Sequence, residues 1–150
     1  MTKTKTQQRM VDALVGTSRI KPEEFAYNTS PNRLKSLSYA VAGWIYMLRR
    51  QKNTRIQGFA SLAILGLAAW LNIEPISWAI LILTVTMVWM AEFINAAVEA
   101  AIDLSTSEFH PMAKVGKDVA SAAVLLGVVA SIIIGLIILL PPLLVKLGLG

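Results

Sequence analysis

The residues with the clearest chemical potential are three carboxylates and one amide, which lie close together in an apolar stretch. They are Glu92, Asn95, Glu99 and Asp103, called here the acidic row. A helix turns by about 100° per residue, so these positions fall within an arc of roughly 80° and share one face. Residues 76–90, just before them, are almost all apolar and have the composition of a membrane span. An ionisable group at the bilayer centre costs at least about 2.5–3.5 kcal/mol on insertion scales, so such a row predicts a function.

A Lys117-Asp118 pair follows the acidic row and completes a set of groups suited to phosphoryl transfer. One carboxylate can hold the Mg²⁺ of MgATP, an ammonium can neutralise phosphate charge, and a second carboxylate can accept the proton of an attacking hydroxyl. The glycines before the row are isolated, so neither a P-loop nor the glycine-rich loop of protein kinases is present. The single histidine, His110, has no nucleophile motif beside it, which argues against Ser-His-Asp hydrolysis.

Two other interpretations of the acidic row stay open at this point. Polar residues inside helices can be packing contacts between helices, contributing about 0.6–2 kcal/mol each, and Lys117 can simply extend its ammonium to the headgroups. Alternatively, Glu92 and Glu99 could be ion ligands of a small cation-conducting or scaffold membrane protein. Asn95 alone is better explained as a packing contact. Glu92 and Glu99 together are not, because the sequence offers neither of them an obvious basic partner within the span.

Composition predicts the elements that must position these residues. With 150 residues, 55% hydrophobic content and a mean hydropathy of +0.61, the chain is expected to be an all-α integral membrane protein. We expect a polar N-terminal tail over residues 1–31 and one membrane domain over residues 32–150. Within that domain we expect an amphipathic helix at the membrane surface and then three spans, at about residues 33–50, 56–73, 76–103 and 112–140. Pro111 suits the first turn of the last span, and Pro141-Pro142 is expected to end it.

The distribution of basic residues predicts how the chain lies in the membrane. Most lysines and arginines precede the first span, Lys114 and Lys117 lie between the second and third, and residues 72–75 carry none. The positive-inside rule therefore places the N-terminus and the 104–118 loop in the cytoplasm. The net charge of +5 is explained by this topology and by attraction to anionic headgroups, and no nucleic-acid partner is expected. The absence of cysteine excludes disulfides and thiol chemistry.

The motif E-x-x-N-x-x-x-E-x-x-x-D over residues 92–103, with Glu-Phe-His-Pro at 108–111 and the later Lys117-Asp118, resembles a family signature. The family is that of the small prokaryotic diacylglycerol kinases and undecaprenol kinases, and a weaker likeness extends over residues 32–142. The resemblance implies a homotrimer in the cell (inner) membrane, with three transmembrane helices and a surface helix per subunit. It implies transfer of the γ-phosphate of MgATP to a lipid hydroxyl, at composite sites between subunits on the cytoplasmic side.

The resemblance also implies roles for individual residues. Glu92 matches the proposed general base, and Glu99 matches a ligand of the ATP-bound metal. The other matches are polar residues that shape the site (Asn95, Asp103), a loop beside the nucleotide (Glu108, Phe109, His110), phosphate- and nucleotide-contacting positions (Lys117, Asp118), a lipid-side position (Ser121) and a nucleotide-side tyrosine (Tyr39). Arg33 resembles the family's N-terminal arginine across a one-residue gap.

Gln51 departs from the family pattern, because many members carry a second metal-binding glutamate at this place. A neutral amide oxygen is a weaker Mg²⁺ ligand than a carboxylate. Either Glu99 and the phosphates hold the metal in this chain, or the match is displaced by one residue.

The lipid acceptor is not decided by the motifs. His110-Pro111 and Ala113-Lys114 are similar to the loop of undecaprenol kinases from Gram-positive bacteria. Ser107-Glu108 and residues 121–123 are instead similar to diacylglycerol kinases. We expect diacylglycerol as the acceptor, with phosphatidic acid as the product, and undecaprenol as the alternative.

Overall fold

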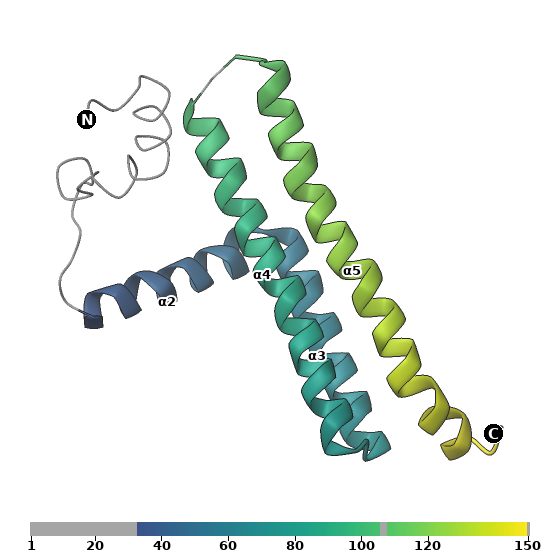
Figure 1. Ribbon diagram of the computed structural model, residues 1–150. Helices are drawn as coiled ribbons and strands as arrows, with labels where there is room; N and C mark the ends of the chain where they lie inside the picture. The colour runs from purple at the N-terminus through teal and green to yellow at the C-terminus, as the bar shows by residue number, and fades with distance from the viewer. Residues whose placement is uncertain (1–32, 106–107, 150) are drawn as a thin grey trace, which may run out of the picture. The chain divides into compact units, whose positions relative to one another are not determined.

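A computed structural model describes residues 33–105 and 108–149, and all regular structure in this part of the chain is helical. The element order is α2 (Arg33–Arg50), α3 (Lys52–Leu71), α4 (Pro75–Ser105) and α5 (Pro111–Lys146) (Figure 1). The predicted all-α fold is confirmed. The predicted polar tail of residues 1–31 lies outside the described residues. The chain divides into a unit ending at Gly43 and a unit of residues 44–150, and each is described by itself.

Helices α3, α4 and α5 are each long and apolar enough to cross a membrane, as the three predicted spans require. They contain 20, 31 and 36 residues, whereas about 20 residues cross the hydrocarbon core. The two longer helices therefore have several turns to spare. Those turns can carry the polar end of α4 and the first turns of α5 beyond the hydrocarbon, where charged side chains reach water.

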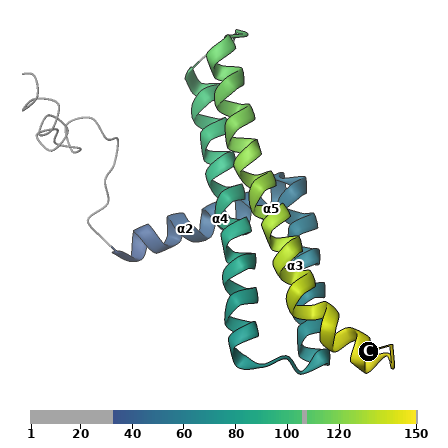
Figure 2. The same cartoon turned by 45° about the vertical axis from the view of Figure 1, so that its right-hand side comes forward.

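The unit of residues 44–150 is organised around an antiparallel pair of long helices. Helix α4 and helix α5 lie side by side and make the most extensive helix–helix contact, while α3 packs less extensively on both (Figure 2). A compact apolar cluster of Ala68, Leu71, Leu81 and Leu139 joins all three helices near the α3–α4 connection. Asn72 ends α3 in the left-handed region at φ 52°, where its N–H donates to the carbonyls of Ala68 and Ala69. This cap allows the short turn into α4.

The end of α2 is anchored to α4 by aromatic contacts. The ring of Trp44 stacks on Trp89 with 5.1 Å between centroids and meets Phe93 at 4.8 Å, while Met47 is buried. The indole N–H of Trp89 donates to the hydroxyl of Ser61 on α3 over 3.1 Å. These contacts fix the α2–α3 junction next to the middle of α4. They therefore determine which α3 side chains can reach the acidic row.

Helix α5 begins as predicted. Pro111 occupies its first turn, and the preceding His110 is the N-cap, whose Nδ1 accepts a hydrogen bond of 3.2 Å from the N–H of Met112. A proline suits this position because the first turn has no intrahelical partner for its N–H. His110 thus has a structural role at the helix start.

The prediction that Pro141-Pro142 ends the last helix is wrong, because α5 continues through both prolines to Lys146. Each proline removes one backbone donor, but a long apolar helix already established upstream tolerates that loss near its end. The extension is also held from outside. The ammonium of Lys146 donates to the carbonyl of Trp70 over 2.6 Å and lies 4.7 Å from the centre of the Trp70 ring.

Gly116 of α5 lies against the side chain of Ile102 on α4, and its substitution tests this packing. A Cβ added at Gly116 would lie 2.9 Å from Cδ1 of Ile102, whereas at Gly135 in the same helix it would meet nothing within 4 Å. We expect Gly116→Leu to lower the free energy of unfolding in detergent by about 1–3 kcal/mol through overpacking. The control Gly135→Leu should be near neutral. Adding Ile102→Ala to Gly116→Leu should recover part of the loss; equal effects at both glycines would contradict the packing argument.

Candidate active site

The first part of the acidic row continues the buried face of α4. The buried residues of α4 recur every three or four positions and are Leu81, Thr84, Val88 and Glu92. The same spacing continues to Asn95 and Glu99, which are half-buried. Glu92 is only 5% exposed. Its side chain therefore lies on the face that α4 turns towards α3 and α5, not on the face left to lipid. This location is what a carboxylate in an apolar span requires.

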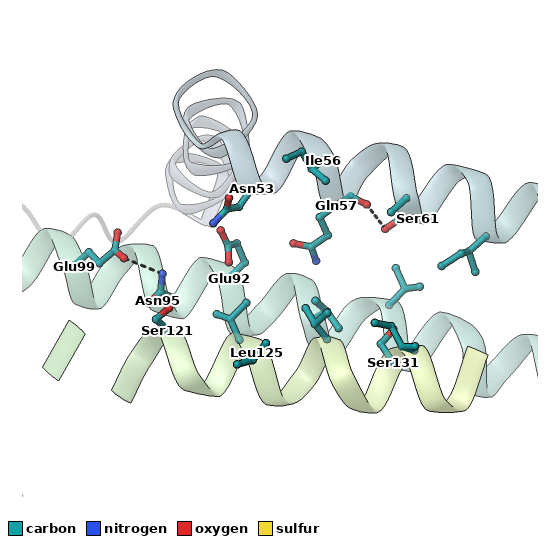
Figure 3. Close-up of a pocket in the computed structure, with 17 residues that line it drawn as sticks. Asn53, Ile56, Gln57, Ser61, Glu92, Asn95, Glu99, Ser121, Leu125 and Ser131 are labelled. Atoms are coloured by element: carbon teal, nitrogen blue, oxygen red, sulfur yellow. Dashed lines mark hydrogen bonds between the residues drawn. The ribbon is translucent and has the colours of Figure 1, made fainter. Parts of the chain in front are cut away.

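Three helices enclose a cavity of about 540 Å³ around Glu92 (Figure 3). The polar side chains of its lining come from all three helices and are Asn53, Gln57 and Ser61 on α3, Glu92, Asn95 and Glu99 on α4, and Ser121 and Ser131 on α5. The rest of the lining is aliphatic and includes Ile64, Val128 and Ile132. Carboxylates gather at one end, so the cavity suits a ligand with a polar head and an apolar chain.

Hydrogen bonds hold the polar end in place. The amide of Asn95 donates from Nδ2 to Oε1 of Glu99 over 3.1 Å. Asn53 faces the Glu92 carboxylate from α3 (Figure 3). Among the described residues, no lysine or arginine forms an ion pair with Glu92 or Glu99. The two carboxyl groups thus contact neutral amides, and no described cation occupies the space beside them.

A second cavity, of about 480 Å³, lies where α4 ends and α5 begins. Its lining includes Ile102, Asp103, Glu108, Phe109, His110, Ala113, Lys114, Lys117 and Asp118. The ammonium of Lys117 pairs with Asp103, and that of Lys114 pairs with Asp118. Lys117 of α5 and Asp103 of α4 thus lie together at this end of the helix pair. This cavity is charged and exposed, in contrast to the first.

The structure separates some of the predicted site residues. Glu99 lines the first cavity and Lys117 the second. Gln51 is the N-cap residue of α3 and lines neither cavity. Arg33 and Tyr39 lie on the part of α2 that belongs to the other unit, where both side chains are exposed. Roles for these three residues stay predictions.

Sequence reasoning missed the contribution of α3. Asn53, Gln57 and Ser61 are spaced four residues apart, so they lie on one helix face and form a polar stripe along the first cavity. Their spacing in an otherwise apolar span was the available signal. The signal is weak because all three residues are uncharged and Asn53 precedes residue 56, where the predicted span begins.

Comparison with known proteins decides the family. The model of the prokaryotic diacylglycerol kinase family matches residues 38–139. The chain belongs to this family. It is 42% identical over 120 residues to a diacylglycerol kinase of Synechocystis sp., covering 79% of this chain and 69% of the relative. It is 36% identical to an undecaprenol kinase of Bacillus subtilis, covering 73% and 89%, and 35% identical to a diacylglycerol kinase of Escherichia coli K12, covering 71% and 87%.

Family membership and the three apolar helices together make the chain a multi-pass membrane lipid kinase. Its reaction is ATP-dependent phosphoryl transfer, which requires a nucleotide and a lipid acceptor to meet. The acidic row is accordingly part of an enzyme. The interpretation as a cation-conducting or scaffold protein is not supported.

The ion pair between Lys117 and Asp103 should contribute little to stability, because the two side chains are 39% and 65% exposed. Exposed pairs contribute about 0–1 kcal/mol and are screened by salt. We expect Asp103→Asn to change the free energy of unfolding by less than about 1 kcal/mol. The difference between variant and wild type should not grow at high salt, because salt screens an exposed ion pair. Unfolding of the purified protein in detergent at two salt concentrations checks this. A much larger loss would mean that the pair holds α4 and α5 together instead of staying available to a ligand.

Proposed function

We propose that this lipid kinase transfers the γ-phosphate of ATP to the free hydroxyl of diacylglycerol and produces phosphatidic acid. One observation carries the proposal: a cavity between membrane helices has at one end carboxylates that pair with no described lysine or arginine, and aliphatic side chains along the rest. Two relatives named diacylglycerol kinase, from Synechocystis sp. and Escherichia coli, support the choice of acceptor.

Glu92 is proposed as the general base. It is buried, it lies in the first cavity, called here the lipid-side cavity, and no basic residue of the described chain pairs with it. In the proposed step the lipid hydroxyl oxygen forms a bond to the γ-phosphorus as the bond to the oxygen of ADP breaks. The hydroxyl proton passes to a Glu92 oxygen, so the attacking oxygen does not develop a positive charge. Asn53 faces this carboxylate and is suited to orient it.

Glu99 is proposed to hold the Mg²⁺ that accompanies ATP. The described residues contain no group of three or more acidic or histidine side chains able to hold a metal ion alone. Mg²⁺ is usually bound through one or two carboxylates together with substrate phosphates, so a single oriented carboxylate fits this use. When bound, the ion would neutralise phosphate charge. Gln51, at the start of α3, is not needed in this arrangement.

The second cavity is proposed as the nucleotide side. Lys117 offers a cation to the phosphates, and the other lining residues Asp103, Glu108, Phe109, His110 and Asp118 surround the nucleotide. Ser121, which lines the first cavity at its polar end, is proposed as a lipid-side contact. By the family resemblance, Tyr39 and Arg33 would approach the nucleotide from the surface helix.

We also propose that the active enzyme is a homotrimer with composite sites between subunits. Two observations support this: Glu99 and Lys117 line different cavities, and much of the apolar surface of α4 and α5 is exposed in one chain. The basic residues of α2 and of the first turns of α5 support a cytoplasmic location of the N-terminus and of the site, in the cell (inner) membrane.

The acceptor is tested by measuring transfer from labelled ATP, with Mg²⁺, to diacylglycerol and to undecaprenol in the same mixed micelles. We expect diacylglycerol to be phosphorylated with the higher kcat/KM, and phosphatidic acid to be the labelled product. The Bacillus subtilis relative is named undecaprenol kinase, so that lipid is the informative competitor. A higher kcat/KM on undecaprenol would overturn the proposed acceptor while leaving a lipid kinase.

The role of Glu92 is tested by Glu92→Gln, which keeps the side-chain shape but removes the proton acceptor. We expect kcat to fall at least about 100-fold while ATP binding stays within a few-fold of the wild type. The matched control is Glu74→Gln, since Glu74 is an exposed carboxylate in the α3–α4 connection outside both cavities. Full turnover by Glu92→Gln would remove Glu92 from the proposed mechanism.

A further inference from the structure

Two buried polar atoms in the lipid-side cavity have no partner among the described residues. They are Nε2 of Gln57 and Oδ1 of Asn95. A third such atom, Oγ1 of Thr54, belongs to a residue outside the cavity lining. Buried donors and acceptors are nearly always paired, and an exception in a ligand cavity indicates a group that the ligand satisfies. The cavity therefore offers its ligand one amide donor and one amide acceptor.

Gln57 is the donor of the two, and its surroundings hold it in place. It lies one helical turn after Asn53 on α3, and its amide projects into the cavity beside the Glu92 carboxylate (Figure 3). Its backbone carbonyl accepts a hydrogen bond of 2.7 Å from the hydroxyl of Ser61, which in turn accepts from Trp89. The backbone at Gln57 is thus fixed against α4, while its Nε2 has no partner in the described part of the chain.

The acceptor lipid supplies the matching group. In 1,2-diacylglycerol the free hydroxyl and the nearest ester are on adjacent carbons, so the protein groups that contact them must be neighbours. Glu92 and Gln57 are such neighbours in the cavity. The unpartnered atom of Asn95 is an oxygen, which accepts hydrogen bonds and cannot donate one to a carbonyl, while the amide nitrogen of Asn95 already donates to Glu99. Nε2 of Gln57 is therefore the buried amide donor that has no partner among the described residues.

We propose that Gln57 is a specificity-determining residue that donates a hydrogen bond to an ester carbonyl of the lipid acceptor, beside the hydroxyl that Glu92 deprotonates. This inference rests on the proposed function. It supplies the selectivity that aliphatic walls lack, since apolar pockets discriminate weakly between similar chains. A polyprenol carries a hydroxyl and an apolar chain but no carbonyl. Its binding would leave the Gln57 donor buried without a partner, and sites of this kind reject such analogues.

The test compares a diester with a diether acceptor, dioleoylglycerol and its dioleyl ether analogue, which differ only in the carbonyl oxygens. Kinetics are measured in mixed micelles for the wild type, Gln57→Leu and Ser131→Ala. Ser131 lines the same cavity at its other end and is the control (Figure 3). We expect the wild type to favour the diester in kcat/KM by about tenfold or more. In Gln57→Leu, kcat/KM should fall by that factor on the diester and stay unchanged on the diether, so that the two values become similar. Ser131→Ala should keep the wild-type ratio of the two values.

Several outcomes would overturn the inference. Equal wild-type rates on diester and diether would do so even if Gln57→Leu fails to fold, as would a Gln57→Leu variant that slows both acceptors equally. A ratio lost in Ser131→Ala but kept in Gln57→Leu would move the carbonyl contact to α5. If the wild type phosphorylates diacylglycerol without discrimination, only the role of Gln57 fails. If it phosphorylates undecaprenol and no diacylglycerol, the proposed acceptor fails as well.

Discussion

The burial of a carboxylate within an apolar helix constrains most of this structure. Glu92 lies in a 31-residue helix suited to a membrane span and is 5% exposed. A carboxylate there cannot face lipid tails without a large desolvation penalty, so neighbouring helices must provide a polar wall opposite it. Helix α3 does this with uncharged residues, Asn53 and Gln57 among them. A lysine in place of Asn53 or Gln57 would instead have formed an ion pair with Glu92 and neutralised the proposed base.

The same constraint divides the site into two environments along one helix. Near Glu92 the cavity is enclosed by three helices and is mainly aliphatic, whereas around Asp103 and Lys117 it is charged and exposed. A membrane lipid kinase needs both environments, because its acceptor is dissolved in the bilayer and ATP in water. Helix α4 is long enough to pass from one to the other, and the acidic row follows its path. Asn95 and Glu99, hydrogen-bonded to each other, lie between the two regions.

The sequence predicted the helices and the acidic row because their signals are strong and local. Apolar runs of spanning length and ionisable residues inside them leave few alternatives, and Pro111 marked a helix start correctly. Two features were not predictable in the same way. The continuation of α5 through Pro141-Pro142 brings Lys146 into contact with Trp70, which is distant in the sequence and which no local signal indicates. The polar stripe of α3 consists of neutral residues, which give no electrostatic signal in the sequence. Its position opposite Glu92 follows from tertiary contacts such as the stacking of Trp44 on Trp89, which places the α2–α3 junction against α4.

The small number of ionisable groups in the lipid-side cavity explains how a short chain can carry out this chemistry. Each carboxylate placed in the membrane lowers the stability of the helix bundle, so the protein keeps only Glu92 and Glu99 in that cavity. In the proposed site, ATP brings its own negative charge when it binds. Its phosphate oxygens can then coordinate a magnesium ion together with Glu99, so that no further protein carboxylate is required. Discrimination between lipid acceptors can likewise be left to neutral amides, which are less costly to bury than charges. A stripe of uncharged residues on α3 is therefore the least destabilising place for a bundle of this size to build selectivity.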